Sequence, residues 1–256
     1  MVIVKRVNDS LMTLGDMAIL FYEAAGAFFR RRLNLGDLLY QLYHIGVKSQ
    51  SVVLITGAFT GMVLAAQTYL QFHKVRMDTA TMAVVSVSML SQLGPVLTGL
   101  MVAGRVGASI AAELGTMKVT EQIDALRTLA THPVDYLVLP RMVAATIALP
   151  LLTSEAIAIG IGGGYYTTTV LLGVDPAYTW EWLLKYTVPN HLYGGLTKAT
   201  FFGAAIALIA CYKGLHCGEG AEGVGRATTE AVVAASITIL ISNFFLTLLV
   251  GRIFAP

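Results

Sequence analysis

Long apolar runs, separated by short polar stretches, set the pattern of the chain. A helix that crosses a bilayer core needs about 20 apolar residues. Four runs of this length carry at most one charged side chain each, over residues 49–72, 79–104, 142–174 and 231–251. A fifth run, over 192–212, contains Lys198 near its start, where a lysine can reach the membrane interface with its ammonium group. The pattern predicts an all-α integral membrane protein with about five transmembrane helices.

The N-terminal segment 9–32 has a different periodicity. Its charged residues are spaced seven apart and therefore follow one stripe of a helix: Asp9, Asp16, Glu23 and Arg30. Another face is apolar and carries Leu11, Leu14, Ala18, Phe21, Ala25 and Phe28. Each charge at the centre of a spanning helix would cost about 2.5–3.5 kcal/mol, whereas a helix in the membrane interface keeps the stripe in water. We therefore predict an interfacial amphipathic helix that ends at the basic cluster 30–32, with a sixth transmembrane helix as the alternative.

Composition and charge agree with this class and give it an orientation. Of the 256 residues, 56% are hydrophobic and 12% are charged, whereas soluble domains carry about 25% charged residues. No block of like charge indicates a nucleic-acid partner. With a cytoplasmic N-terminus and five spans, most of the 17 lysine and arginine residues fall inside, as the positive-inside rule requires. Residues 104–129 then lie in the cytoplasm, and segment 175–191, with Trp180 and Trp182, lies outside.

A polar island between the second and third spans contains a second amphipathic pattern. Its apolar positions repeat at spacings of four and three and share one narrow face of a helix over 116–130: Val119, Ile123, Leu126 and Ala130. Polar side chains cover the other faces: Lys118, Glu121, Gln122, Asp124 and Arg127. Two interpretations are open, a loop helix packed on its own bundle and a coupling helix that docks on a cytoplasmic motor.

Several stretches resemble one protein family. Residues 112–115 (Ala-Glu-Leu-Gly) and 120–126 (Thr-Glu-Gln-Ile-Asp-Ala-Leu) resemble the signature of MlaE-type permeases, the membrane subunits of ABC systems that move phospholipids between bacterial membranes. Shorter matches follow in the same order along the chain, at 60–64, 140–141, 149–153 and 223–229. The resemblance covers about residues 10–250.

The resemblance implies a permease subunit that moves phospholipids between the inner and outer membranes and maintains outer-membrane lipid asymmetry. It implies a multi-pass protein of the bacterial inner membrane with a cytoplasmic N-terminus, which forms a homodimer. The implied partners are a cytoplasmic ABC ATPase dimer, which binds ATP and Mg, and a periplasmic MCE-domain lipid-binding protein. The chain itself would bind no cofactor and catalyse no reaction, and Glu121 and Asp124 would engage the ATPase.

The family architecture also implies a lipid cavity that opens toward the periplasm. Its expected lining comes from the outer halves of the first two spans: Gln67, Tyr69, Leu70, Val85, Met89, Gln92 and Leu93. Family members often carry Arg-Glu before a Leu-Gly-Pro motif, where this chain has Ser91-Gln92. A neutral pair cannot hold a phosphate by charge, so the head-group contact, the lipid preference and the direction of transport stay open.

Two further features have alternative interpretations. Glu155 is an isolated carboxylate within the third long run, which marks either a functional site or a hydrogen-bonded structural residue. Small residues at helical spacing allow close helix packing, either within the bundle or between two subunits. These stripes are Gly57 and Gly61; Gly99, Ala103 and Gly107; and Gly160 and Gly164.

Other functional classes lack their required patterns. Residues 218–223 match GxGxxG, but they lie between two apolar runs rather than in a βαβ unit. The five histidines lack metal-ligand spacing, so we predict no metal site. An integral-membrane lipid-modifying enzyme would need a cluster of catalytic polar groups at one membrane face. An ion-coupled secondary transporter would need inverted repeats and several buried ionisable residues.

Overall fold

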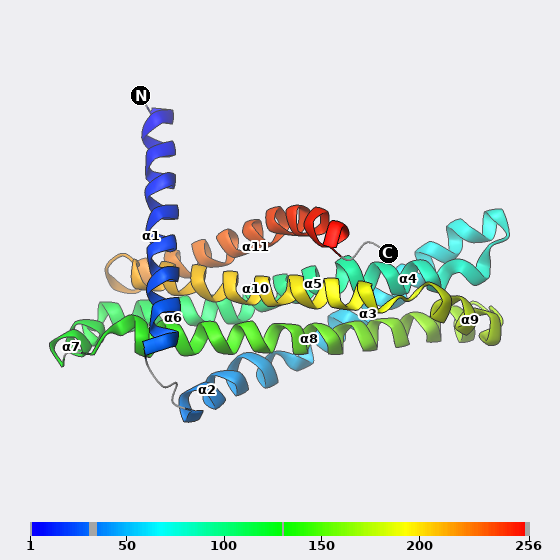
Figure 1. Ribbon diagram of the computed structural model, residues 1–256, viewed down its shortest axis with the longest axis horizontal. Coiled ribbons are helices and arrows are strands. Elements are labelled where there is room, and N and C mark those ends of the chain that lie inside the picture. Colours follow the sequence, from blue (N-terminus) through cyan, green and yellow to red (C-terminus); the bar gives the residue numbers. More distant parts are fainter. Residues whose placement is uncertain (1, 31–34, 130, 254–256) are drawn as a thin grey trace.

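The computed structural model describes residues 2–30, 35–129 and 131–253, which form helices and no strand (Figure 1). The α-helices are α1 (Val2–Arg30), α2 (Leu35–Leu42), α3 (Lys48–Phe72), α4 (Thr81–Ser88), α5 (Gly94–Val102), α6 (Ala108–Val119), α7 (Gln122–Thr128), α8 (Leu139–Tyr166), α9 (Pro176–Tyr186), α10 (Pro189–Leu215) and α11 (Gly220–Ile253). Short 3-10 or π-helical turns join them: η1 (Tyr43–Val47), η2 (His73–Val75), η3 (Asp78–Ala80), η4 (Met89–Leu93), η5 (Ala103–Gly107), η6 (Val134–Val138) and η7 (Thr167–Leu171).

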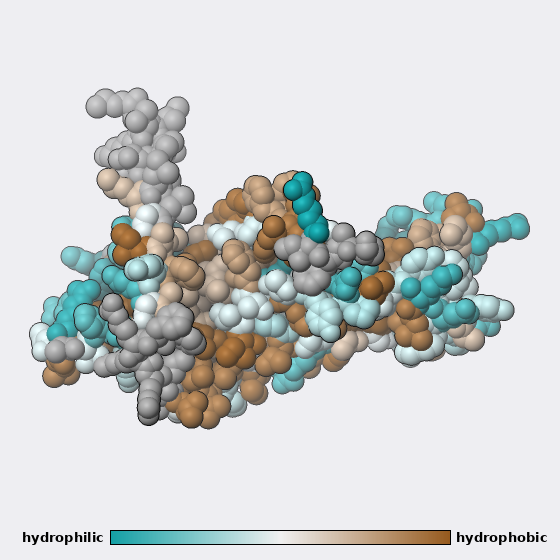
Figure 2. All heavy atoms as spheres, in the orientation of Figure 1, coloured by the Kyte–Doolittle hydropathy of each residue, from teal (hydrophilic) through white to brown (hydrophobic). Residues whose placement is uncertain are grey.

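Five continuous helical segments of the described chain are long and apolar enough to cross a membrane: Leu35–Val75, Asp78–Val119, Val134–Leu171, Pro189–Leu215 and Gly220–Arg252. Each overlaps one of the predicted apolar runs. Figure 2 shows hydrophilic residues gathered at the two ends of the bundle and hydrophobic residues between them. The prediction of an all-α membrane fold is confirmed.

Helix α8 is the centre of the bundle and packs along α3 on one side and α10 on the other. Its contact with α3 is made by small residues. A Cβ atom added at Gly61 would overlap the carbonyl oxygen of Gly160, and one at Gly57 would lie 2.7 Å from the carbonyl oxygen of Ala156. The backbones therefore touch without side chains between them, and these predicted stripes form a seam within one subunit.

Helix α1 runs across the bundle rather than along it (Figure 1), which is the direction expected of a helix in the membrane plane. The five long apolar segments do not include it. Asp16 and Glu23 are exposed, as the predicted charged stripe requires. The face that packs on the bundle differs from the predicted one, because Leu20, Ala24 and Ala27 are buried whereas Phe21 is 50% exposed. Five side chains of the predicted pattern lie outside the described part of the structure: Asp9, Leu11, Leu14, Phe28 and Arg30. Residues 31–32 lie outside it entirely.

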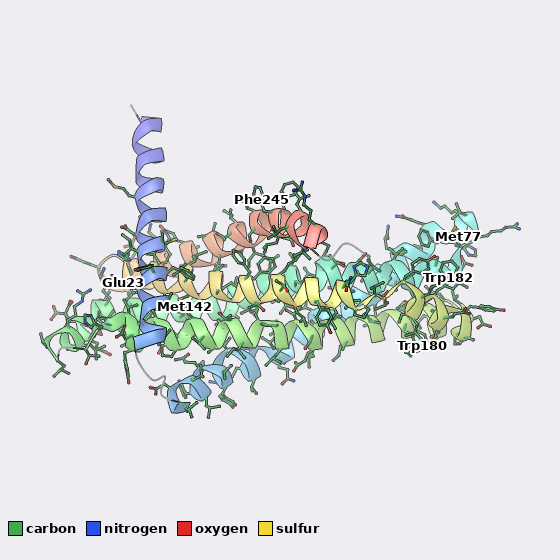
Figure 3. The ribbon with its side chains drawn as sticks, in the orientation of Figure 1. Glu23, Met77, Met142, Trp180, Trp182 and Phe245 are labelled. Carbon is green, nitrogen blue, oxygen red and sulfur yellow. The ribbon has the colours of Figure 1, made fainter. Side chains whose placement is uncertain are left out.

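The two ends of the bundle carry different elements. Helix α7 and the link between α10 and α11 lie at one end, and α9 lies at the other (Figure 1). Figure 3 places Met77, Trp180 and Trp182 together at the α9 end. Helix α9 begins where Asp175 accepts a hydrogen bond from the backbone N–H of Ala177 at 2.8 Å, which is an ordinary N-cap. Segment 175–191 thus lies opposite α7, on the side that the charge pattern assigns to the outside.

Candidate functional site

A proline creates an unusual hydrogen-bond acceptor in the second span. The π-helical turn η4 ends directly before Gly94 and Pro95. Proline has no N–H, so it cannot donate to the carbonyl group four residues earlier, which belongs to Ser91. The ammonium group of Lys198, on α10, donates to this carbonyl oxygen at 2.9 Å. A backbone oxygen beside the proline turn therefore accepts a hydrogen bond from a charged side chain of another span.

Lys198 is almost completely buried, with 2% of its surface exposed. It also donates to Thr247 Oγ1 at 2.9 Å and to Gln92 Oε1 at 3.2 Å. These acceptors are neutral, and no carboxylate of the described residues forms an ion pair with Lys198. Its three N–H donors are thus satisfied, but its positive charge has no counter-charge, and a buried charge is costly unless it is paired.

A polar network from α11 holds the acceptors in place. Gln92 Oε1 also accepts a hydrogen bond from Asn243 Nδ2 at 3.2 Å, and Gln92 Nε2 donates to Thr247 Oγ1 at 3.2 Å. Asn243 and Thr247 are one helical turn apart and so face the same way. The second, fourth and fifth spans therefore meet at one polar point inside an apolar bundle.

A cavity of about 290 Å³ opens beside this network. We call it the Lys198 cavity; it is lined by Ser91, Gln92, Asn190, His191, Gly194, Gly195, Lys198, Thr247, Val250 and Gly251. Glycines bring α10 close to its walls, since a Cβ atom at Gly195 would overlap the carbonyl oxygen of Leu90 and one at Gly194 would lie 2.7 Å from Val250 Cγ1. None of these lining residues is acidic, so the cavity suits an anionic group.

Only one of the predicted lipid-lining residues, Gln92, lines this cavity. Val85 and Met89 are fully buried in a hydrophobic cluster that Leu93 packs against. Gln67 and Leu70 are exposed on the outside of α3, and the Tyr69 ring lies against His73 on the same helical segment. The predicted residues lie on different faces of their helices and contact different neighbours. They therefore do not form one pocket in the described subunit.

The sequence interpretation missed Lys198, Asn243, Thr247 and His191. It expected that the Lys198 ammonium group could reach the membrane interface, whereas the structure buries this group against Ser91 and Gln92. Two signals were present in the chain: a lysine within an apolar run, and Asn243 and Thr247 at helical spacing in another apolar run.

The polar island forms two helices rather than the single predicted helix over 116–130. Residues 116–119 continue α6, which extends from the second span, and α7 (Gln122–Thr128) follows a break. At the break, Glu121 adopts a left-handed conformation with φ of 59°. This turn separates Val119, which is 38% exposed, from Ile123, which is buried. The two residues therefore do not share one inward face, and Ala130 lies outside the described residues.

The predicted coupling residues gather at the α7 end of the bundle. Glu121, Gln122, Asp124 and Arg127 are exposed, and Lys118 is half-buried. Arg127 forms an ion pair with Asp124 at 3.0 Å. An exposed surface with both charges at the tip of the molecule can bind a partner through complementary charges.

Glu155 lies in the middle of α8 and is half-buried. Its Oε2 atom has no hydrogen-bond partner among the described residues, and it does not line the Lys198 cavity. Both interpretations of this carboxylate remain open.

Comparisons with known proteins agree with one another. Residues 38–249 match the family described as Permease MlaE. A probable ABC transporter permease protein of Rickettsia conorii is 45% identical over 243 residues, which cover 95% of this chain and 94% of the relative. A probable ABC transporter permease protein of Synechocystis is 39% identical and covers 90% and 92% of the two chains.

One relative carries a more specific description. The intermembrane phospholipid transport system permease protein MlaE of Haemophilus influenzae is 35% identical over 244 residues, which cover 95% of this chain and 94% of that protein. With the family match over most of the chain, the resemblance seen in the sequence is confirmed. The chain belongs to the MlaE family of ABC transporter permeases.

Proposed function

We propose that this permease moves phospholipids between the inner and outer membranes of a bacterium and that Lys198 holds the phosphate of the lipid head group. The observation that carries the proposal is the buried, unpaired charge of Lys198 beside a cavity without acidic groups. A phosphodiester supplies the missing negative charge and takes the place of one of the three neutral acceptors of Lys198, since hydrogen bonds between charged groups are about twice as strong as neutral ones. The description of the Haemophilus influenzae relative as a phospholipid transport permease agrees with this cargo.

The neutral pair Ser91-Gln92 fits the same arrangement. Family members often carry Arg-Glu at these positions. Here Ser91 and Gln92 serve as acceptors that orient the Lys198 ammonium group, through one backbone and one side-chain oxygen. The single positive charge of the site then comes from α10 instead of the second span.

The proposed assembly follows the family pattern. Two copies of the chain form a homodimer in the inner membrane, with the N-terminus and α7 in the cytoplasm. An ABC ATPase dimer, which binds ATP and Mg, docks on α7, where Glu121 and Asp124 engage its basic groups. A periplasmic MCE-domain lipid-binding protein docks at the α9 end. The exposed charges of α7 and the aromatic α9 end support these positions.

Replacement of Lys198 tests the cargo. The variant Lys198→Met keeps the length of the side chain and removes its charge. We expect phospholipid that co-purifies with the complex, measured by mass spectrometry per subunit, to fall about 10-fold or more, because a hydrogen bond to a charged group contributes roughly 1.5–3 kcal/mol. The control is Lys185→Met, which removes an exposed lysine that lies over Trp182 on α9.

Equal phospholipid content in wild type and Lys198→Met would contradict the proposal. An equal loss in Lys185→Met would also contradict it, because the effect would then come from charge in general. Size-exclusion chromatography of each variant shows whether the complex stays assembled, so that loss of lipid is compared only between folded proteins.

A further inference from the structure

An ion pair with a buried arginine joins α6, the helix before α7, to α8, the central helix of the bundle. Arg141, in the first turn of α8, lies 2.9 Å from Glu113 of α6, measured from Nη2 to Oε1. The Arg141 side chain is 5% exposed, whereas that of Glu113 is 54% exposed. Glu113 precedes the break at Glu121 by about two helical turns. The pair therefore links α6, at the end of the second span, to the start of α8 in the third span.

The guanidinium group of Arg141 is fixed on a second side. Its Nη1 atom donates to the carbonyl oxygen of Leu137 at 2.6 Å, within the π-helical turn η6 that precedes α8. The planar guanidinium group presents its N–H donors in a rigid arrangement. A displacement of Glu113 therefore acts on η6 and α8 together rather than on a freely rotating side chain.

A continuous rigid helix does not connect α7 with the membrane spans. The left-handed turn at Glu121 separates α6 from α7, and α7 itself is only seven residues long. Movement that begins at α7 therefore reaches the bundle through the turn at Glu121 and through the contacts of α6 with the neighbouring helices. The Glu113–Arg141 pair is one such contact, and it has a defined direction and distance.

From Arg141 onward, close backbone contacts continue toward the Lys198 cavity. One turn after Arg141, a Cβ atom added at Gly203 of α10 would overlap the carbonyl oxygen of Ala145. Gly203 lies five residues after Lys198 on the same helix. On the other side of α8, the glycine seam contacts α3 just as closely. Closely packed elements transmit small displacements because little free space absorbs them.

We propose that the Glu113–Arg141 ion pair is the positioning contact through which ATP-driven movement at α7 reaches α10 and the lipid that Lys198 holds. The proposal rests on the proposed function for its cargo. Neither Arg141 nor Glu113 lines the Lys198 cavity, so we assign both a positioning role through the helices that they join. Removal of Glu113 leaves Arg141 buried without its counter-charge, and this change also releases α6 from α8.

The test compares coupling with catalysis in the assembled transporter. In liposomes that contain the full complex with its ATPase, Glu113→Gln should lower the phospholipid moved per ATP hydrolysed about 10-fold, while ATP hydrolysis stays within about twofold of wild type. The exchanged pair Glu113→Arg with Arg141→Glu should restore most of this ratio. The matched control is Glu230→Gln, which breaks the ion pairs with Lys213 and Arg226 at the same end of the bundle.

Proportional losses of hydrolysis and transport in Glu113→Gln, or an equal loss of the ratio in Glu230→Gln, would overturn the proposal. A second measurement is independent of the cargo. Hydrogen exchange of the α10 backbone should change between nucleotide-free and ATP-bound wild-type complex, and Glu113→Gln should lose this change. If wild type moves no phospholipid, the proposed function fails. Hydrogen exchange then decides the ion-pair proposal, which fails if Glu113→Gln keeps the nucleotide-dependent change.

Discussion

Single glycines decide how closely α3 and α8 approach. Gly61 faces Gly160 so tightly that a Cβ atom would overlap the opposite carbonyl oxygen. A Cβ atom at Gly162, two residues further along α8 and on a different face, has no atom within 4 Å. We predict that Gly61→Ala destabilises the protein by about 1–3 kcal/mol, the usual cost of excess volume in a packed core. The measurement is the thermal melting temperature in detergent.

Gly162→Ala is the control for this prediction. It adds the same atom where there is room, and alanine favours a helix by about 1 kcal/mol over glycine. Its melting temperature should equal or exceed that of wild type. A Gly61→Ala protein with an unchanged melting temperature would mean that the seam can open without cost.

The residue-level site was only partly predictable from the sequence. Gln92 was assigned to the lipid site, but the role of Lys198 depends on its contact with Ser91, which lies 107 positions earlier in the chain. No local pattern relates these two residues, because their contact arises from the packing of α10 on η4. Gly195, which permits this packing, has no periodic signal of its own.

At the scale of elements, the apolar runs were sufficient to predict the five spans but not the break in the polar island. The spacing of Val119, Ile123 and Leu126 continues across residues 120–121, so hydrophobic periodicity predicts one helix. The left-handed conformation of Glu121 interrupts it, although non-glycine residues seldom adopt this conformation. Strained backbone of this kind often marks functional segments, and here it separates the proposed docking helix from the span.

The turn and the charge of Glu121 can be tested separately. We predict that Glu121→Lys reduces the ATPase retained in co-purification about 10-fold or more, because like charges at an interface cost several kcal/mol. Glu121→Gly keeps the left-handed turn, which glycine adopts readily, and removes only the carboxylate. It should therefore give a smaller loss than the reversal of charge.

Glu181→Lys provides the control for Glu121→Lys, since Glu181 is an exposed carboxylate of α9 at the opposite end of the bundle. It should leave ATPase retention unchanged. Retention equal to wild type in Glu121→Lys would remove Glu121 from the docking surface.

At the scale of the whole molecule, the two ends of the helix bundle determine where each partner can dock. Five spans place the α7 end and the α9 end on opposite sides of the membrane, and α1 crosses the bundle near the α7 end (Figure 1). Asp16 of α1 lies 3.4 Å from the hydroxyl group of Tyr212 on α10. This contact fixes α1 on the same side as α7, the side where the lysine and arginine residues are concentrated.

Labelling of single cysteines tests this orientation. We predict that a membrane-impermeant maleimide labels Tyr178→Cys of α9 in intact spheroplasts, whereas Gly225→Cys, on the link side of α11, is labelled only after the membrane is opened. Both positions are exposed, and the native Cys211 and Cys217 are buried, so the wild-type background should be low. The reverse pattern would place α7 outside, where no cytoplasmic ATPase could reach it, and would contradict the coupling role of α7 together with the orientation.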